Sequence, residues 1–225
     1  MSASSREGTP ELRRSQSALP PGVKEAGRAV LTPVVRLAMA LHLTPNRITV
    51  IGLGITIVAS ALVAAGWLVL AAAILTAGSL LDAVDGALAR AQGNVTAFGG
   101  FLDSTLDRAG EAIIYIGVGA WLLSALEEPL WPVVAAMTAL AASFLVSYAH
   151  ARAQGIGLAA DIGLAPRTER LVLVIAGIAL AGIGFTAGLV GALVIIAALA
   201  AVTVFQRIRH VWHLSRAAGS DSKEN

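Results

Sequence analysis

A succession of long apolar segments is the feature that most restricts how this chain can fold. Six such segments follow one another, and most approach the length that crosses a bilayer, about 20 residues. They are Ile48–Trp67, Leu68–Leu81, Ala109–Leu126, Leu130–Tyr148, Leu171–Leu189 and Val190–Phe205. With 56% hydrophobic and 13% charged residues, the chain is too apolar for an ordinary soluble domain. We expect an all-α integral membrane protein with six transmembrane helices.

Basic residues are distributed unevenly over the connections. They lie in the N-terminal arm, after the second and fourth segments and at the C-terminus, whereas the connections near Trp67, Glu127–Pro129 and Thr186–Gly191 contain none. Positively charged connections remain on the cytoplasmic side of a membrane. The pattern therefore predicts a multi-pass protein of the inner (cell) membrane with both termini in the cytoplasm, which requires an even number of spans.

The N-terminal region is polar at first and then amphipathic. Residues 1–20 lack the apolar core of a secretory signal, so we expect a disordered cytoplasmic tail. Apolar positions from Pro21 to Leu43 favour an amphipathic helix on the membrane surface, with a simple basic leader as the alternative. Thr44-Pro45-Asn46 should end this helix and begin the first span. The membrane domain then comprises residues 21–213, and residues 214–225 form a second cytoplasmic tail.

Four carboxylates lie in or beside two of the apolar segments. Asp82 and Asp85 are three residues apart and Asp103 and Asp107 are four apart, so each pair shares one face of a helix. Ionised carboxylates are costly in hydrocarbon and normally mark a functional polar interior. Two such pairs can form an all-oxygen site for hard divalent cations, which bind phosphates. The residues predict a membrane enzyme with a phosphate-containing substrate.

The carboxylates belong to a longer pattern. It reads Asp82-x2-Asp85-Gly86-x2-Ala89-Arg90-x8-Gly99-x3-Asp103-x3-Asp107. This pattern resembles the signature of the CDP-alcohol phosphotransferase family at every fixed position, and the resemblance covers roughly Leu43 to Arg209. Members of the family use an alcohol to displace CMP from a CDP-linked lipid or alcohol; they have six transmembrane helices and are homodimers. The resemblance implies the same chemistry, fold and assembly here.

The resemblance also implies a role for individual residues. Two Mg²⁺ ions, or Mn²⁺ in their place, are expected to bind Asp82, Asp85, Asp103 and Asp107, with Asp107 also the catalytic proton acceptor. A metal pair neutralises charge on the phosphoryl oxygens and stabilises the leaving group. The expected contacts to the CDP-lipid are Pro45, Asn46, Arg47, Ile48, Gly86, Arg90 and Thr96.

The segments after the aspartates resemble the branch of the family that uses inositol phosphate, the phosphatidylinositol-phosphate synthases. These segments are DSTLDR at Asp103–Arg108, SYAHARAQG at Ser147–Gly155 and APRTER at Ala165–Arg170. The resemblance implies transfer of the phosphatidyl group of CDP-diacylglycerol to inositol phosphate, with release of CMP. The acceptor's phosphate is then expected to bind Ser147, His150, Arg170 and Arg207. His150 departs from the Lys or Arg of many relatives and lacks their permanent charge.

Three alternatives remain open, and none involves nucleic acid. The same chemistry with glycerol 3-phosphate would make the protein a phosphatidylglycerophosphate synthase. An intramembrane prenyltransferase also uses aspartates and magnesium, but its acidic motifs are far apart, whereas one short loop separates Asp85 from Asp103. An ion-coupled transporter would use buried carboxylates but would favour inverted repeats, which are not evident. Glu111 continues the acidic face by one turn and is expected to have a structural role, paired with Arg108 or Arg170.

Overall fold

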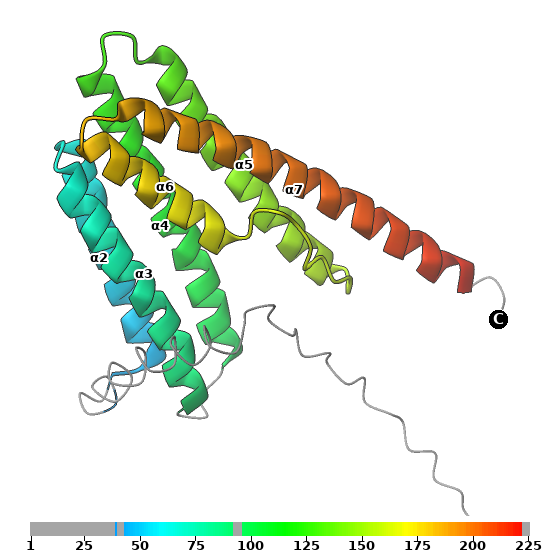
Figure 1. The fold of residues 1–225 in the computed structure, drawn as a ribbon. Coiled ribbons are helices and arrows are strands. Elements are labelled where there is room, and N and C mark those ends of the chain that lie inside the picture. The colour runs from blue at the N-terminus through cyan, green and yellow to red at the C-terminus, as the bar shows by residue number, and fades with distance from the viewer. Residues whose placement is uncertain (1–38, 40–42, 92–95, 222–225) are drawn as a thin grey trace, which may run out of the picture.

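The computed structural model describes residue 39 and residues 43–91 and 96–221, without the side chains at positions 82, 83, 85–87, 89–91 and 217–221. This part of the chain folds into helices without strands, which confirms the all-α prediction. The helices are α2 (Pro45–Ala64), α3 (Leu68–Ala91), α4 (Ala97–Ala125), α5 (Leu130–Gly155), α6 (Arg167–Gly182) and α7 (Thr186–Asp221) (Figure 1). The expected tail at 1–20, most of the amphipathic helix at Pro21–Leu43 and the turn at Gly93-Asn94 lie outside the described residues.

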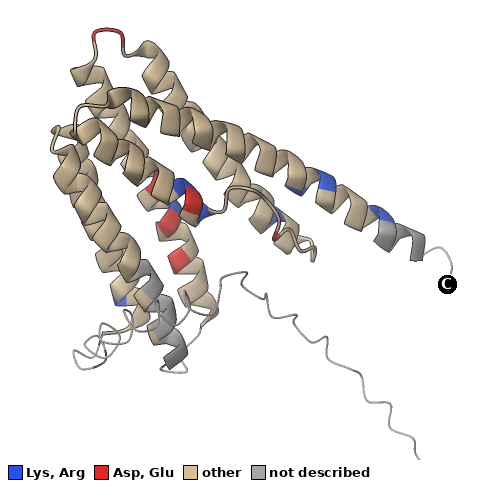
Figure 2. Cartoon of the chain, viewed as in Figure 1, with Lys and Arg blue, Asp and Glu red and all other residues tan. Residues whose placement is uncertain are grey.

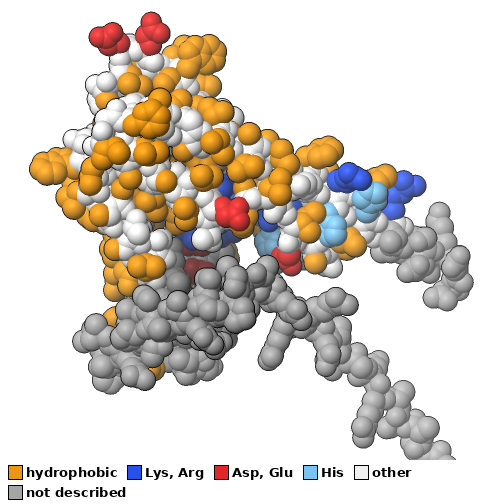
Figure 3. All heavy atoms as spheres, viewed as in Figure 1, with side chains coloured by type: hydrophobic (Ala, Val, Ile, Leu, Met, Phe, Trp, Pro, Cys, Tyr) orange, Lys and Arg blue, Asp and Glu red, His pale blue; other side chains and the backbone are white. Residues whose placement is uncertain are grey.

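The lengths and polarity of these helices are those of a multi-pass membrane protein. By length and composition, α2, α5 and Thr186–Arg216 of α7 can cross a bilayer, and Leu68–Leu81 of α3 is a shorter apolar stretch. Charged residues occupy the first half of α4, and α6 is only 16 residues long. Hydrophobic side chains are spread over the described part of the face shown in Figure 3, as expected for a surface in contact with lipid. Six spans remain a prediction.

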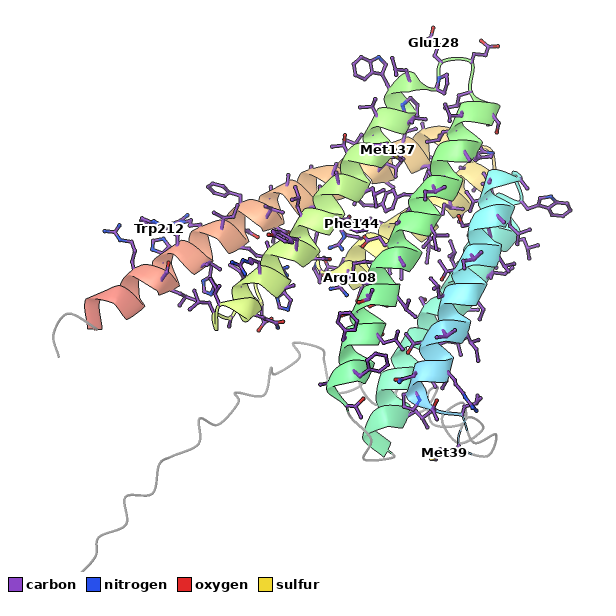
Figure 4. The ribbon with its side chains drawn as sticks, turned by 180° about the vertical axis from the view of Figure 1, so that it is seen from behind. Met39, Arg108, Glu128, Met137, Phe144 and Trp212 are labelled. Carbon is purple, nitrogen blue, oxygen red and sulfur yellow. The ribbon has the colours of Figure 1, made fainter. Side chains whose placement is uncertain are left out.

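The helices form two groups joined by α6. In one group α2 packs against α3 and α4, and in the other α5 packs against α7. α6 contacts both α3 and α7, and α4 contacts α5. From both sides, the ends of α5 and α7 nearer the C-terminus diverge from α2, α3 and α4 (Figures 1 and 4). The start of α6 lies where the two groups separate.

A close approach between α2 and α4 holds the first group together. The Ser60 hydroxyl of α2 donates a hydrogen bond of 2.5 Å to the Ile113 carbonyl of α4. A Cβ atom built at Gly117 would lie 2.5 Å from the Ser60 carbonyl oxygen and would collide with the Ser60 side chain. Because only glycine leaves room for this contact, Gly117 determines how closely the two helices pack.

Most helix boundaries agree with expectation, and one does not. α2 begins at Pro45, and the turns before Leu68 and Leu130 lie where basic residues are absent. The prediction of a fifth span over Leu171–Leu189 and a sixth over Val190–Phe205 was wrong at their junction. The turn instead occupies residues 183–185, where Gly184 has a φ of +93°, a conformation that ends helices and favours glycine. α7 also continues as a helix to Asp221, within the expected tail at 214–225.

Candidate active site

The second aspartate pair of the signature lies in the first half of α4. Thr96 starts this helix: its backbone is extended, and its hydroxyl accepts a 3.0 Å hydrogen bond from the Gly99 amide. Asp103 and Asp107 follow on one face of the helix, and both are half-buried. The structure thus places these two residues on one face of α4, as the spacing predicts.

Two of the expected CDP-lipid residues lie together beside Gly99. A Cβ atom built there would be 3.0 Å from the Thr96 hydroxyl and 3.2 Å from the side-chain oxygen of Asn46 on α2. The glycine of the signature therefore allows the start of α2 to approach the start of α4. Pro45 is half-buried and Arg47 is exposed at the same end of α2.

Ile48 has a different environment from its neighbours. Its side chain is buried and packs with Val84 and Leu88 of α3. This contact fixes the start of α2 against the segment of α3 that carries the first aspartate pair. The side chains of four signature residues lie outside the described part, and their roles stay predictions: Asp82, Asp85, Gly86 and Arg90.

An arginine from α6 lies next to Asp107. The Arg167 Nη1 atom is 3.0 Å from Asp107 Oδ2, and the Arg108 Nη1 atom is 4.0 Å from the same oxygen. Arg108 also donates a 2.6 Å hydrogen bond to the Ser104 carbonyl, within its own helix. Figure 2 shows acidic residues of α4 facing basic residues at the start of α6, and Figure 4 labels Arg108 from behind. The site therefore combines carboxylates with cations that can bind phosphate.

A second arginine from α6 binds the next acidic residue of α4. Arg170 is 1% exposed, and its Nε and Nη2 atoms donate to the two Glu111 carboxylate oxygens at 3.1 and 3.3 Å. Its Nη1 atom donates to the Ala165 carbonyl at 2.8 Å. Of the two partners expected for Glu111, Arg108 and Arg170, the structure shows Arg170. An arginine has more N–H donors than these bonds use, and no other acceptor for them occurs among the described residues.

Glu111, Arg167 and Arg170 line a cavity between α2, α3, α4 and α6. Its wall includes apolar side chains such as Leu75 and Ile114. Its polar lining comprises Thr56, Ser79, Glu111, Tyr115, Arg167 and Arg170. The cavity thus borders both apolar side chains of the helices and the charged residues at the start of α6.

Three of the four expected acceptor residues bind the loop between α5 and α6, residues 156–166. His150 of α5 lies 3.3 Å from the Ala160 carbonyl, and Arg170 of α6 donates to the Ala165 carbonyl. Arg207 of α7 donates to the Ile162 carbonyl at 2.9 Å and to the Val146 carbonyl of α5 at 2.6 Å. The fourth residue, Ser147, is half-buried on α5. The structure therefore brings His150, Arg170 and Arg207 to one loop from three different helices.

The contacts of His150 connect the loop to α5. A carbonyl oxygen only accepts hydrogen bonds, so the 3.3 Å contact with Ala160 uses a proton on Nδ1. The Gln154 amide nitrogen lies 3.1 Å from Nε2, and the Asp161 carboxylate lies 3.6 Å from Nδ1. His150 therefore holds the loop of residues 156–166 against α5.

Two residues at this site were missed by the sequence analysis. The sequence spacing could have indicated Arg167. It lies three residues before Arg170, so both can share one face of a helix, as Asp107 and Glu111 do four residues apart. Thr203 of α7 had none beyond being polar in an apolar helix. It is fully buried, and its hydroxyl accepts hydrogen bonds from the amides of Leu164 and Ala165.

The oxygen ligands at the start of α4 fit a hard divalent cation. Asp103 and Asp107 offer carboxylate oxygens from one helical face, and such oxygens are the ligands that Mg²⁺ and Mn²⁺ prefer. Among the described side chains, no group of three acidic or histidine residues is close enough to hold a metal. A complete site would need the α3 pair, whose side chains lie outside that part of the chain.

The sequence is similar to proteins of known activity. It is 40% identical over 133 residues to the archaetidylinositol phosphate synthase of Methanothermobacter thermautotrophicus, which is 59% of this chain and 64% of that protein. It is 39% identical over 135 residues to the phosphatidylinositol phosphate synthase of Mycolicibacterium smegmatis, which is 59% of this chain and 60% of that protein. The similarity therefore spans less than two thirds of these relatives.

The fold is similar to crystal structures of the Mycobacterium tuberculosis phosphatidylinositol phosphate synthase. The structure with CDP-DAG bound has a TM-score of 0.76 and 30% identity, and the match covers 82% of this chain and 94% of that one. The structure with manganese and citrate has a TM-score of 0.75 and 31% identity, over 81% and 88%. The family model for CDP-alcohol phosphatidyltransferase matches residues 42–206, a range that includes α2 to α6 and most of α7. The chain therefore belongs to the CDP-alcohol phosphatidyltransferase family.

Proposed function

We propose that the protein is a phosphatidylinositol-phosphate synthase. It transfers the phosphatidyl group of CDP-diacylglycerol to a hydroxyl group of inositol phosphate and releases CMP. The observation that carries the proposal is the arrangement of two arginines of α6 against the acidic face of α4, with Arg167 3.0 Å from Asp107 and Arg170 bound to Glu111. This arrangement puts cations for an acceptor's phosphate next to the carboxylate expected to accept its proton.

The site requires divalent metal, as the signature aspartates and the manganese complex of the M. tuberculosis relative suggest. We propose two Mg²⁺ ions, replaceable by Mn²⁺, held by Asp82, Asp85, Asp103 and Asp107. When bound, they supply positive charge that stabilises the phosphoryl oxygens and the departing CMP. The pyrimidine nucleotide lies at the starts of α2 and α4, where Asn46 and Thr96 meet at Gly99.

The protein's own side chains perform the remaining tasks. Asp107 accepts the proton of the attacking hydroxyl group, and Arg167 keeps a positive charge beside that carboxylate. Arg170 is oriented by Glu111 and Ala165 and directs its remaining N–H groups to the acceptor's phosphate. His150 and Arg207 act by holding the loop of residues 156–166, in addition to any direct contact with that phosphate.

The assembly and orientation follow the family. We propose a homodimer in the inner (cell) membrane, with the active site and both termini on the cytoplasmic side. The basic C-terminal part of α7 supports this orientation, because the basic residues of α7 lie at the end opposite to the acidic turn between α4 and α5 (Figure 2).

A test of the acceptor decides between this proposal and its alternatives. Purified full-length protein in nanodiscs is given CDP-diacylglycerol, with and without Mg²⁺, and CMP release is measured with inositol phosphate, glycerol 3-phosphate or serine. We expect Mg²⁺-dependent release of CMP with inositol phosphate and not with the other two acceptors. Release with glycerol 3-phosphate but not inositol phosphate would overturn the acceptor and leave the reaction class intact. Failure to release CMP with any acceptor would overturn both.

A further inference from the structure

The loop of residues 156–166 is fastened to α7 by a single buried threonine. The Thr203 hydroxyl accepts hydrogen bonds from the amides of Leu164 at 3.2 Å and Ala165 at 3.1 Å. It donates its own proton to the Leu199 carbonyl at 2.8 Å, within α7. The hydroxyl is therefore fully used, and it satisfies two backbone N–H groups of the loop.

The methyl group of Thr203 contributes to the same contact. Gly163 has a φ of +139°, and a Cβ atom built there would collide with the Thr203 methyl carbon. The loop thus passes directly over the threonine side chain at a residue that must be glycine for both conformation and space. The hydroxyl group and the methyl group together set the distance between residues 163–165 and α7.

The fastened segment ends at the residue that orients Arg170. The Ala165 amide donates to Thr203, and the Ala165 carbonyl accepts from Arg170 Nη1 at 2.8 Å. Ala165, Arg170 and Thr203 are all buried, so water cannot replace either bond without entering the interior. Ala165 therefore connects Thr203 of α7 to the Arg170 guanidinium group of α6 through two hydrogen bonds.

We propose that Thr203 is a positioning residue for the acceptor's phosphate site. It sets the position of the Ala165 carbonyl, which fixes one edge of the Arg170 guanidinium while Glu111 fixes the other. This inference rests on the proposed function, in which Arg170 binds the phosphate of the acceptor. Loss of the Thr203 hydroxyl weakens acceptor binding without direct contact between Thr203 and substrate, and leaves the CDP-lipid site at the starts of α2 and α4 unchanged.

The test compares three full-length variants. Thr203→Val keeps the shape and removes the hydroxyl group, and Thr203→Ser restores it. Thr138→Val is the matched control, because Thr138 donates to the carbonyl four residues earlier, as Thr203 does, but lies exposed on α5. For each variant, kcat and the KM values for acceptor and CDP-diacylglycerol are measured, together with hydrogen–deuterium exchange of the Leu164 and Ala165 amides.

We expect Thr203→Val to raise the acceptor KM by about tenfold, since buried hydrogen bonds are lost. The KM for CDP-diacylglycerol should stay within about twofold, and Thr203→Ser should recover most of the acceptor affinity. The two amides should exchange faster in Thr203→Val alone. If that variant does not fold, Thr203→Cys, a weaker hydrogen-bonding group of similar size, should give a smaller rise in the same KM.

An unchanged acceptor KM in a folded Thr203→Val protein would overturn the inference, as would equal rises in both KM values. The proposed function is tested separately, by the CMP release of the wild-type protein with each acceptor. If the wild type uses an acceptor other than inositol phosphate, the KM of each variant is measured for that acceptor. The exchange of the two amides is measured without any substrate.

Discussion

Both carboxylate oxygens of Glu111 accept hydrogen bonds from the buried guanidinium of Arg170, one helical turn beyond Asp107. A buried ion pair adds little net stability, because removing both charges from water offsets their attraction. Its contribution here is orientation, since the planar guanidinium is held at a fixed angle beside the cavity. The pair also makes the site sensitive to the loss of either partner.

Arg170→Ala should weaken acceptor binding and also destabilise the protein. It leaves the Glu111 carboxylate buried without its partner, which costs about 3–5 kcal/mol. The double variant Glu111→Ala/Arg170→Ala removes that unpaired charge, so the thermal unfolding midpoint should recover. The acceptor KM should stay high in both proteins. A double variant with wild-type acceptor affinity would show that Arg170 does not bind the acceptor.

Asp107→Asn should abolish turnover and leave CDP-lipid binding measurable. The amide cannot accept the proton of the attacking hydroxyl group, and general-base catalysis is worth about 10²–10⁴ in rate. CMP release and binding of CDP-diacylglycerol by calorimetry are the two measurements. Glu127→Gln, at an exposed carboxylate between α4 and α5, serves as the control and should behave as wild type. Substantial activity in Asp107→Asn would remove Asp107 as the proton acceptor.

Metal removal should stop CMP release reversibly. EDTA is expected to abolish activity, and added Mg²⁺ or Mn²⁺ to restore it, because the oxygen ligands suit hard cations. Asp103→Asn lacks one negative charge, so its activation curve should shift to higher metal concentration. An identical curve for Asp103→Asn and wild type would contradict the assignment of Asp103 as a ligand.

Gly117→Ala should lower stability without a specific effect on substrate KM values. The added methyl group collides with Ser60, and overpacking of this kind costs about 1–3 kcal/mol. Gly119→Ala is the matched control two residues away, where the new Cβ would lie 3.7 Å from the Met137 methyl carbon, an ordinary contact. Thermal unfolding in detergent should show a lower midpoint for Gly117→Ala only. Equal midpoints would mean that α2 and α4 can separate at little cost.

The parts of the fold that were predictable have local causes. Thr96 and Pro45 start helices through their own backbone and capping chemistry, and the four-residue spacing of Asp103 and Asp107 places them on one face. The turn at residues 183–185 was missed because the apolar run continues across it without a charged residue. Hydropathy alone therefore could not distinguish the end of one helix from the start of the next.

The contacts of the acceptor residues depend on tertiary structure. The sequence indicated that Arg207 is basic and near the membrane surface, but its carbonyl partners are set by the path of residues 156–166. Thr203 gave no signal for the same reason, since its two amide donors lie almost forty positions earlier in the chain. A residue that binds backbone atoms of a distant loop leaves no pattern in its own neighbourhood.

The ion pairs between α4 and α6 also bear on how the protein is made. Glu111 and Arg170 are separated by 59 positions, so the ribosome completes α4 well before the arginines of α6 exist. Until α6 emerges, the nascent helix exposes acidic groups that the translocon would insert poorly into lipid. Chains interrupted before Arg167 should therefore be unstable in the membrane, because the acidic residues of α4 would lack the arginines that pair with them in the folded protein.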